Sequence, residues 1–101
     1  MHSVVYEVAA RFTDQLTADA WVAWMLTEHI ADVVRAGADH GRVIRLDESP
    51  LCFVAQYEFS TAKALENYLS QHAPRLRAEG LKRFSPDQVQ YTRRTGVVLG
   101  P

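Results

Sequence analysis

Two segments of strict two-residue alternation, each followed by a helical pattern, constrain the fold of this chain most strongly. The segment Val4–Phe12 places Val, Tyr, Val, Ala and Phe on one side and Val, Glu, Ala and Arg on the other. The segment Leu51–Phe59 alternates Leu, Phe, Ala, Tyr and Phe with Cys, Val, Gln and Glu. A period of two is typical of a half-buried β-strand. We therefore predict a strand over each segment.

A long helical pattern follows the first strand. Apolar residues recur at helical spacing up to Val34, Thr17 is the predicted N-cap, and Gly37 is expected in the left-handed position that ends a helix. Since helices in globular proteins average about 10–14 residues, we expect a kink in this one near residues 28–30. A loop over residues 37–41 should follow.

The middle of the chain predicts a hairpin and a second helix. A short strand over residues 43–47 and a turn at residues 48–50 precede the strand over residues 51–59, which indicates an antiparallel pair. Ser60 or Thr61 then caps a helix whose apolar residues are spaced i, i+3, i+4 and i+7.

Pro74 is expected to interrupt this second helix, because proline removes a backbone donor and disfavours helical backbone at the residue before it. We predict a short helical turn over residues 74–79 that ends at Gly80. A turn at residues 85–87 then leads into a last strand over residues 89–94.

The resulting element order is β-α-β-β-α-β, the ferredoxin-like arrangement of an α+β domain. One domain over residues 1–101, ordered from about residue 3 to about residue 95, would carry a four-stranded antiparallel sheet with two helices on one face. The other face would present Val5, Ala9, Cys52 and Val54. Because one helix layer cannot cover both faces, we predict a homodimer that packs sheet against sheet.

Composition excludes several classes of protein. With 11 basic and 12 acidic residues the net charge is −1, which disfavours nucleic-acid binding. The single cysteine, Cys52, allows no intrachain disulfide, and its apolar neighbours favour a buried thiol. The longest apolar run, Trp21–Leu26, is too short for a membrane span, and no signal-peptide pattern precedes it, so a cytoplasmic protein is expected. No glycine-rich nucleotide motif is present, and no cofactor is expected.

Several segments together resemble a bacterial family of unknown function in the dimeric α/β-barrel superfamily. They are residues 4–8 (VVYEV), 21–25 (WVAWM), 28–30 (EHI), 56–59 (QYEF), 65–69 (LENYL), 72–77 (HAPRLR) and 83–84 (RF). The resemblance spans residues 4–94 and implies a ferredoxin-like protomer that pairs into a barrel. The superfamily includes cofactor-free monooxygenases, haem-degrading enzymes and isomerases. The family has no settled activity, and this chain departs from it where Ala38 follows Gly37 in place of a large apolar residue.

His29 is the candidate catalytic residue. It stands four residues after Met25 and eight after Trp21, at the margin of the apolar stripe of the first helix. An imidazole there could face a cleft between helix and sheet as a general acid or base. The alternative is a structural histidine that hydrogen-bonds a neighbouring group.

Aromatic residues and their neighbours are predicted to line a pocket for a flat organic ligand. The predicted lining residues are Tyr6, Trp21, Trp24, Met25, Phe53, Tyr57, Tyr68 and His72. The alternative is that these residues simply fill the core and that His72 stabilises the end of the second helix.

Basic residues are concentrated near the C-terminus. Residues 72–95 hold six basic and two acidic side chains, whereas residues 1–71 are acidic overall. Of this basic set, Arg75 and Arg77 are the candidates for contact with an anion or a partner protomer. A solvated surface with intrachain ion pairs is the alternative.

These observations leave three hypotheses open. The first is a dimeric protein that binds a small organic ligand. The second is a cofactor-independent monooxygenase or isomerase that acts on an aromatic metabolite, with His29 as acid or base; it depends partly on analogy with the superfamily. The third is haem or metal binding through His29 or His72, for which a metal would need a further ligand such as Glu28 or Glu58.

Overall fold

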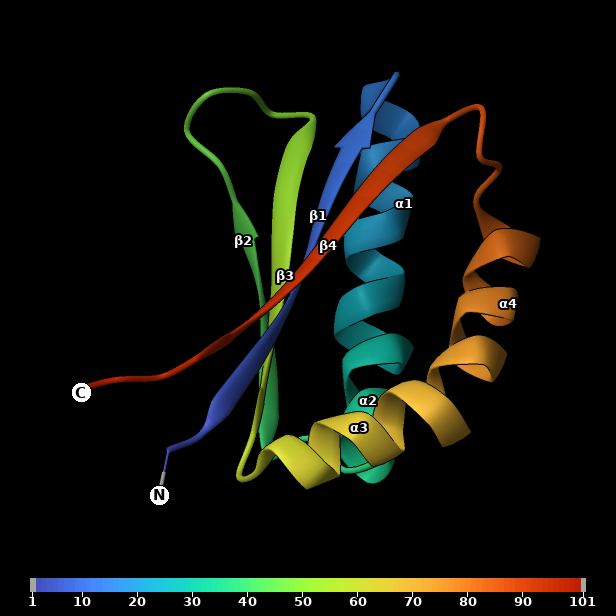
Figure 1. Ribbon diagram of the computed structural model, residues 1–101. Helices are drawn as coiled ribbons and strands as arrows, with labels where there is room; N and C mark the ends of the chain where they lie inside the picture. The colour runs from blue at the N-terminus through green and yellow to red at the C-terminus, as the bar shows by residue number, and fades with distance from the viewer. Residues whose placement is uncertain (1, 101) are drawn as a thin grey trace.

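A single antiparallel sheet forms one layer of the molecule (Figure 1). The computed structural model describes residues 2–100, so Met1 and Pro101, the two ends of the predicted domain, lie outside it. The strands are β1 (Val4–Phe12), β2 (His40–Arg45), β3 (Cys52–Phe59) and β4 (Val89–Val97), in the order β2-β3-β1-β4. The predicted four-stranded antiparallel sheet and the ferredoxin-like order of elements are confirmed.

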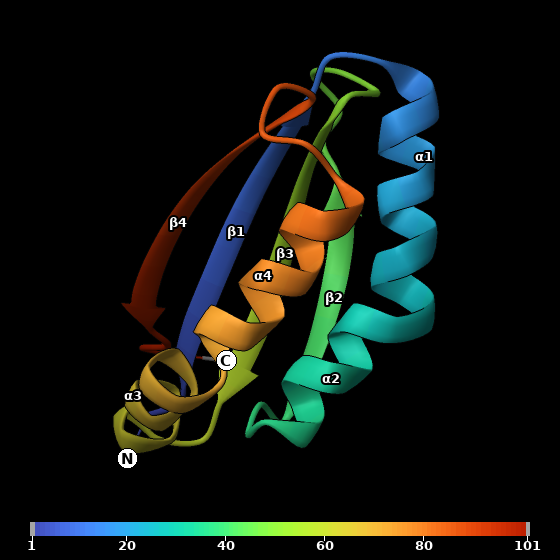
Figure 2. The ribbon, with the colours of Figure 1, turned by 90° about the vertical axis from the view of Figure 1, so that its right-hand side faces the viewer.

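All helices lie on one face of this sheet, as Figures 1 and 2 show from two directions. The first crossover consists of α1 (Gln15–Trp24), the π-helical turn η1 (Met25–His29) and α2 (Ile30–Arg35). The second crossover consists of α3 (Ala62–Gln71) and α4 (Ala73–Arg83). Helices on one face were predicted, as were the irregularity in the first crossover and the break at Pro74 in the second.

The first crossover begins earlier than predicted. Asp14, not Thr17, is the N-cap of α1, because its carboxylate accepts the backbone N–H of Thr17 (2.8 Å). The irregularity expected near residues 28–30 is the π-helical turn η1, in which the N–H of Ile30 reaches back to the carbonyl of Met25. Gly37 has a φ of +129°, as expected for the glycine that ends a helix.

The second crossover contains a longer helix than predicted. Pro74 does separate α3 from α4, and it lies in the first turn of α4, where its missing N–H costs no hydrogen bond. However, α4 continues through Gly80 to Arg83 in place of a short turn. Tertiary packing explains the difference: Phe84 just beyond the helix is buried, and a Cβ at Gly80 would lie 3.4 Å from Cη2 of Trp24.

Two strands also differ in their bounds from the prediction: β2 spans His40–Arg45 where residues 43–47 were predicted, and β4 spans Val89–Val97 where residues 89–94 were predicted. β2 begins at His40 within the predicted loop, because Gly41 pairs with Tyr57 of β3. A Cβ at Gly41 would lie only 2.6 Å from Cδ1 of Tyr57, so the absence of a side chain lets that ring lie across β2. β4 extends to Val97 because its whole length pairs with β1, from Phe12–Val89 to Val4–Val97.

The sheet face away from the helices carries a row of polar side chains across all four strands. Arg42, Gln56, Glu7 and Arg94 are register neighbours on β2, β3, β1 and β4. The Nε of Arg42 donates to Gln56 (3.0 Å), and Glu7 accepts from Gln56 (2.8 Å) and Arg94 (2.7 Å). We call these four residues the polar row.

Small apolar side chains flank the polar row, as predicted. Ala9 pairs with Val54, Val5 pairs with Glu58, and Cys52 is a buried free thiol opposite Arg11. Between residues 2 and 100, no helix is both long enough and apolar enough to cross a bilayer.

Candidate functional pocket

A pocket of about 290 Å³ lies between the covered face of the sheet and the helices. Its wall includes six tyrosine and tryptophan rings, and eight of the predicted site residues line it: Tyr6, Trp21, Trp24, Met25, His29, Tyr57, Tyr68 and Arg77. The strand residues face it because their register positions alternate toward the helices, and Trp21 and Trp24 face it from one side of α1. Residues that follow the helical period of α1 and the two-residue period of the strands therefore line the same pocket.

His29 lies in this wall at the end of η1. Its ring stacks on Trp24, with centroids 4.5 Å apart, and meets the ring of Tyr57 edge-on at 6.4 Å. Burial lowers the pKa of His29 to about 4, although the nearby charge of Asp32 acts in the opposite direction. The Nδ1 atom is buried and has no hydrogen-bond partner among residues 2–100. His29 is therefore a neutral imidazole at pH 7.

The tyrosines connect His29 to the other part of the pocket. The rings of Tyr57 and Tyr6 stack with their centroids 6.1 Å apart, and the ring centroids of Tyr6 and Tyr68 are 6.0 Å apart. Burial raises the pKa of Tyr68 to about 12 and raises that of Tyr57 well above its usual value. The phenols of Tyr57 and Tyr68 are thus protonated at neutral pH and can donate a hydrogen bond to a ligand.

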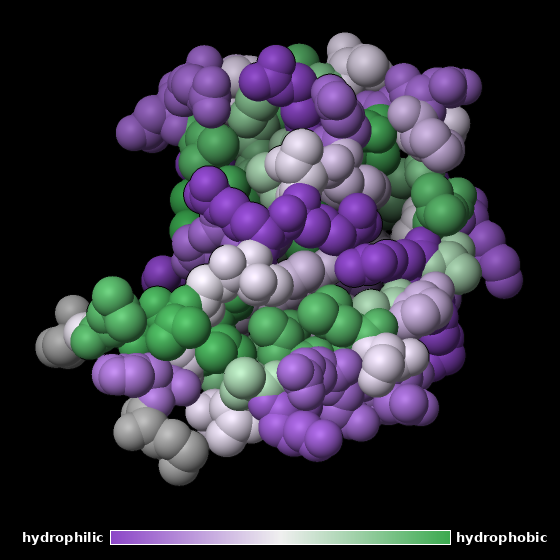
Figure 3. Space-filling view, in the orientation of Figure 1, coloured by the Kyte–Doolittle hydropathy of each residue, from purple (hydrophilic) through white to green (hydrophobic). Residues whose placement is uncertain are grey.

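Two arginines supply the only positive charges among the described lining residues. Arg77 of α4 donates to the Tyr6 hydroxyl oxygen (2.9 Å). The guanidinium of Arg93 of β4 lies 5.2 Å from the centre of the Tyr91 ring. None of the described residues in the pocket wall is acidic. In the space-filling view, hydrophilic residues form a band across the molecule over the middle of β4 (Figure 3).

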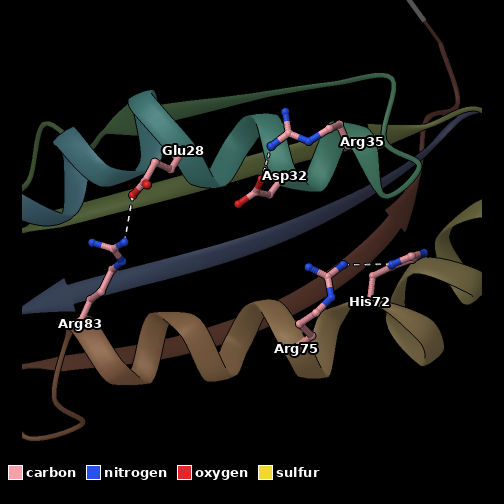
Figure 4. A network of polar contacts seen from close by, with 6 residues as sticks. All are labelled: Glu28, Asp32, Arg35, His72, Arg75 and Arg83. Atoms are coloured by element: carbon pink, nitrogen blue, oxygen red, sulfur yellow. Dashed lines mark hydrogen bonds and ion pairs between the residues drawn. The ribbon is translucent and has the colours of Figure 1, made fainter.

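An ion pair connects the two helical walls next to this pocket. Nη2 of Arg83, at the end of α4, lies 3.2 Å from Oε2 of Glu28 in η1, and Figure 4 shows the pair spanning the space between the two helices. The guanidinium of Arg83 also lies 5.9 Å from the centre of the Trp24 ring. Because both partners are about half exposed, the pair contributes little stability. It bridges α4 and η1, the turn that ends at His29.

Three predicted site residues lie elsewhere. Phe53 packs on Phe12 and Trp21 in the core, so Trp21 separates it from the pocket. His72 is at the junction of α3 and α4, where its backbone N–H bonds to the carbonyl of Tyr68. Arg75 is exposed and directs a guanidinium nitrogen to Nδ1 of His72 (3.3 Å; Figure 4). The break at Pro74 redirects the chain, so His72 does not continue the inward stripe of α3.

Sequence reasoning missed other residues of the wall. They are Val8, Ala55, Leu76, Gly80, Leu81, Tyr91 and Arg93. The alternation of β1 and β3 already placed Val8 and Ala55 on the covered face. Tyr91 and Arg93 required the length and register of β4, and Gly80 and Leu81 required α4 to continue past residue 79. Among residues 2–100, no group of three His, Cys, Asp or Glu side chains could hold a metal ion.

Residues 3–98 match DUF4286, a domain of unknown function. The chain belongs to this family. No curated protein matches its sequence. The predicted resemblance to a family of unknown function with a ferredoxin-like fold is thereby confirmed.

Solved structures share the fold of this DUF4286 domain at low sequence identity. A dimeric ferredoxin-like protein from an uncultured marine organism is 12% identical, with a TM-score of 0.73 over 100% of this chain and 99% of that one. SnoaB, a cofactor-independent oxygenase from Streptomyces nogalater, is 14% identical, with a TM-score of 0.74 over 98% and 95% of the two chains. A protein of unknown function from Nitrosomonas europaea is 12% identical, with a TM-score of 0.69 over 100% and 93%.

Proposed function

We propose that this DUF4286 protein binds a flat, largely apolar organic molecule in the pocket between sheet and helices. The observation that carries the proposal is the wall of the pocket, which includes six tyrosine and tryptophan rings around an open volume of about 290 Å³. Ligand sites are typically concave, apolar and aromatic, with a few polar groups that fix orientation. Here the phenols, the His29 imidazole and the two arginines are those groups.

The two tryptophans of the chain provide a direct readout of binding, because both line the pocket. In a ¹⁵N-labelled protein, titration with 2-naphthamide should shift both indole N–H signals. Gly80→Leu would place a side chain beside Trp24 and should abolish the shift. Ala78→Leu, at an exposed position of the same helix, is the matched control and should bind as the wild type does. Unchanged indole signals with aromatic probes of both neutral and anionic type would refute the proposal.

A second candidate function is proton transfer to or from the bound molecule by His29. It is favoured by the neutral, unpartnered imidazole, since a general base must be unprotonated and free to accept a proton. The likeness to SnoaB is a likeness of fold and provides only an analogy. In this function His29 would take a proton from an acidic C–H or O–H group, as in an isomerase or a cofactor-independent oxygenase.

Hydrogen exchange can test this candidate without knowledge of the natural substrate. The benzylic C1 protons of 2-tetralone are acidic, and the protein should accelerate their exchange in D₂O above the buffer rate. His29→Asn should remove the acceleration, whereas His40→Asn, at an exposed position on β2, should retain it. Equal exchange rates for the wild type and His29→Asn would exclude His29 as the base.

We also propose that a second copy of the chain covers the open face of the sheet. Related structures described as dimeric support this, as do the small apolar residues that flank the polar row. Light scattering should give twice the 11.4 kDa mass of the chain. Ala9→Arg, in the middle of the open face, should yield a folded monomer, whereas Ala20→Arg on the exposed side of α1 should remain dimeric. A monomeric wild type would refute the proposal.

A further inference from the structure

Arg77 and Arg93 face the pocket without an acidic partner. Arg77 comes from α4 and Arg93 from β4, so the two cations approach from different elements. The ion pairs formed among residues 2–100 use Arg35, Arg83, Arg94 and His40, and neither pocket arginine takes part. This contrasts with Arg94, the neighbour of Arg93 on the open face, which pairs with Glu7 at 2.6 Å.

The two guanidinium groups are held in place but retain free donors. Arg77 uses one nitrogen for the Tyr6 hydroxyl, which is itself fixed by contact with Tyr57 and Tyr68. A guanidinium carries five N–H donors, so most of those of Arg77 remain available. Arg93 is held against the face of Tyr91 through a cation–π contact, which uses none of its N–H groups.

The positive charge of these arginines reaches the interior of the pocket. At the Tyr68 hydroxyl, burial and the nearby Tyr6 raise the pKa, whereas Arg77, Arg93 and, from outside the pocket wall, Arg75 act to lower it. Because the other ionisable groups in the wall are tyrosines and the neutral His29, nothing in the wall compensates this charge. An aromatic surface beside two unpaired arginines matches a ligand that is both flat and anionic.

We propose that the pocket selects planar aromatic anions, such as aromatic carboxylates, and that Arg77 and Arg93 hold the anionic group. The inference depends on the proposed ligand-binding function and specifies its ligand class. The ring system would lie among Trp24, Tyr57 and Tyr6, and the carboxylate would receive hydrogen bonds from the two guanidinium groups. Arginine is suited to this role because its fork of donors matches a carboxylate.

A pair of probes of the same shape separates this inference from the proposed function. 2-Naphthoate carries a negative charge at pH 7, and 2-naphthamide does not. The wild type should bind the naphthoate at least about tenfold more tightly, the effect of one charge-assisted contact. Arg77→Gln and Arg93→Gln should each remove most of that preference, measured in the same variant as the ratio of its affinities for the two probes. Lys82→Gln removes a charge of the same sign from an exposed position of α4 outside the pocket wall; it is the matched control and should keep the preference.

Each outcome has a defined meaning. Equal affinity of the wild type for both probes would overturn the anion inference and leave the proposed binding function standing. A preference for naphthoate that both glutamine variants retain would likewise overturn it. Failure of both probes to bind would refute the proposed function and, with it, this inference. Circular dichroism of each variant would show that it is folded, and intact binding of 2-naphthamide would show that its pocket is formed.

Discussion

The charged side chains on the two faces of the sheet differ in whether they have partners. On the open face, the residues of the polar row bond to one another. Glu7 accepts hydrogen bonds from Gln56 and Arg94, and Arg42 donates a hydrogen bond to Gln56. On the covered face, Arg77 and Arg93 have no acidic partner among the described residues, and His29 has a buried, unpartnered nitrogen.

This difference separates a surface suited to protein contact from a surface suited to a ligand. Polar groups that are already paired can be buried against another protein without losing a partner, because their hydrogen bonds remain intact. Arg77 and Arg93, which are exposed beside the aromatic pocket and have no acidic partner among the described residues, instead offer N–H donors to another molecule. A protein with a complementary surface could therefore pack against the open face, whereas a ligand of the covered face would need a group that accepts hydrogen bonds from the arginines.

The largest effect is expected from truncating the core of the covered face. Phe59 is fully buried and contacts Tyr68, with ring centroids 5.5 Å apart. Phe59→Ala should lower the free energy of unfolding by about 3–5 kcal/mol in chemical denaturation. Val54→Ala on the half-buried open face should cost less than about 1 kcal/mol in the monomeric Ala9→Arg background. Similar losses at both sites would contradict the contrast between the faces.

The second prediction concerns the pH dependence caused by His29. Its pKa is about 4 in the folded protein and 6.5 in the unfolded chain, so the unfolded chain binds more protons between these values. Stability should therefore fall as pH decreases from 6.5 to 4, by at most about 3 kcal/mol in total, and should not change through His29 above pH 6.5.

Urea denaturation across this pH range measures the effect of His29. Acid also destabilises the wild type through carboxylates such as Glu7 and Asp14, whose pKa values are lowered in the fold. The measurement is therefore the difference between the wild type and His29→Asn. A difference that stays constant from pH 7 to pH 4 would show that the imidazole is not buried in its neutral form.

A smaller effect is expected for Glu7 in the polar row. The hydrogen bond from Gln56 and the nearby Arg94 hold the pKa of Glu7 below its usual value. Glu7→Gln keeps the shape but removes the charge, and it should cost about 1 kcal/mol in thermal or urea unfolding. Glu48→Gln, at an exposed loop position, is the control and should leave stability unchanged. An equal effect of both changes would show that the row is not specifically paired.

The smallest effect is expected at Gly80, and it should be stabilising. Alanine is favoured over glycine within a helix by about 0.5–1 kcal/mol. The added Cβ would lie 3.4 Å from Trp24, which is ordinary contact. Gly80→Ala should therefore raise the unfolding free energy by about 0.5 kcal/mol. A loss of stability would indicate that Trp24 packs against α4 more tightly than the structure shows.

The sequence predicted the fold well where one local pattern dominated. β1, most of β3, the cap at Thr61 and the glycine at residue 37 were assigned correctly, because alternation, capping and left-handed backbone are local properties. Apart from the N-cap of α1, which is Asp14 and not Thr17, the errors fell where a distant contact decided. β2 begins before the predicted residue 43, where the ring of Tyr57 lies in the space that a side chain at Gly41 would occupy. α4 continues through Gly80, where Trp24 packs against the helix and against Phe84.

The candidate site followed the same division. Seven residues of the pocket wall were predicted from periodicity and residue type, since an inward-facing position on a strand or helix is a repeating feature, and Arg77 was predicted from its charge. Phe53 has the correct inward orientation, but Trp21 separates it from the pocket. Arg93 could not be distinguished from Arg94 until the register of β4 placed them on opposite faces.

The sequence by itself therefore determined the order of the elements, the two faces of the sheet and the aromatic character of the covered one. It could do so because the hydrophobic period and the residue types are local properties of the sequence. Only the tertiary structure decided which residues share the pocket, which arginines lack a partner and that His29 is a buried, neutral imidazole. Those properties depend on distances between segments far apart in the chain, and no local pattern encodes them.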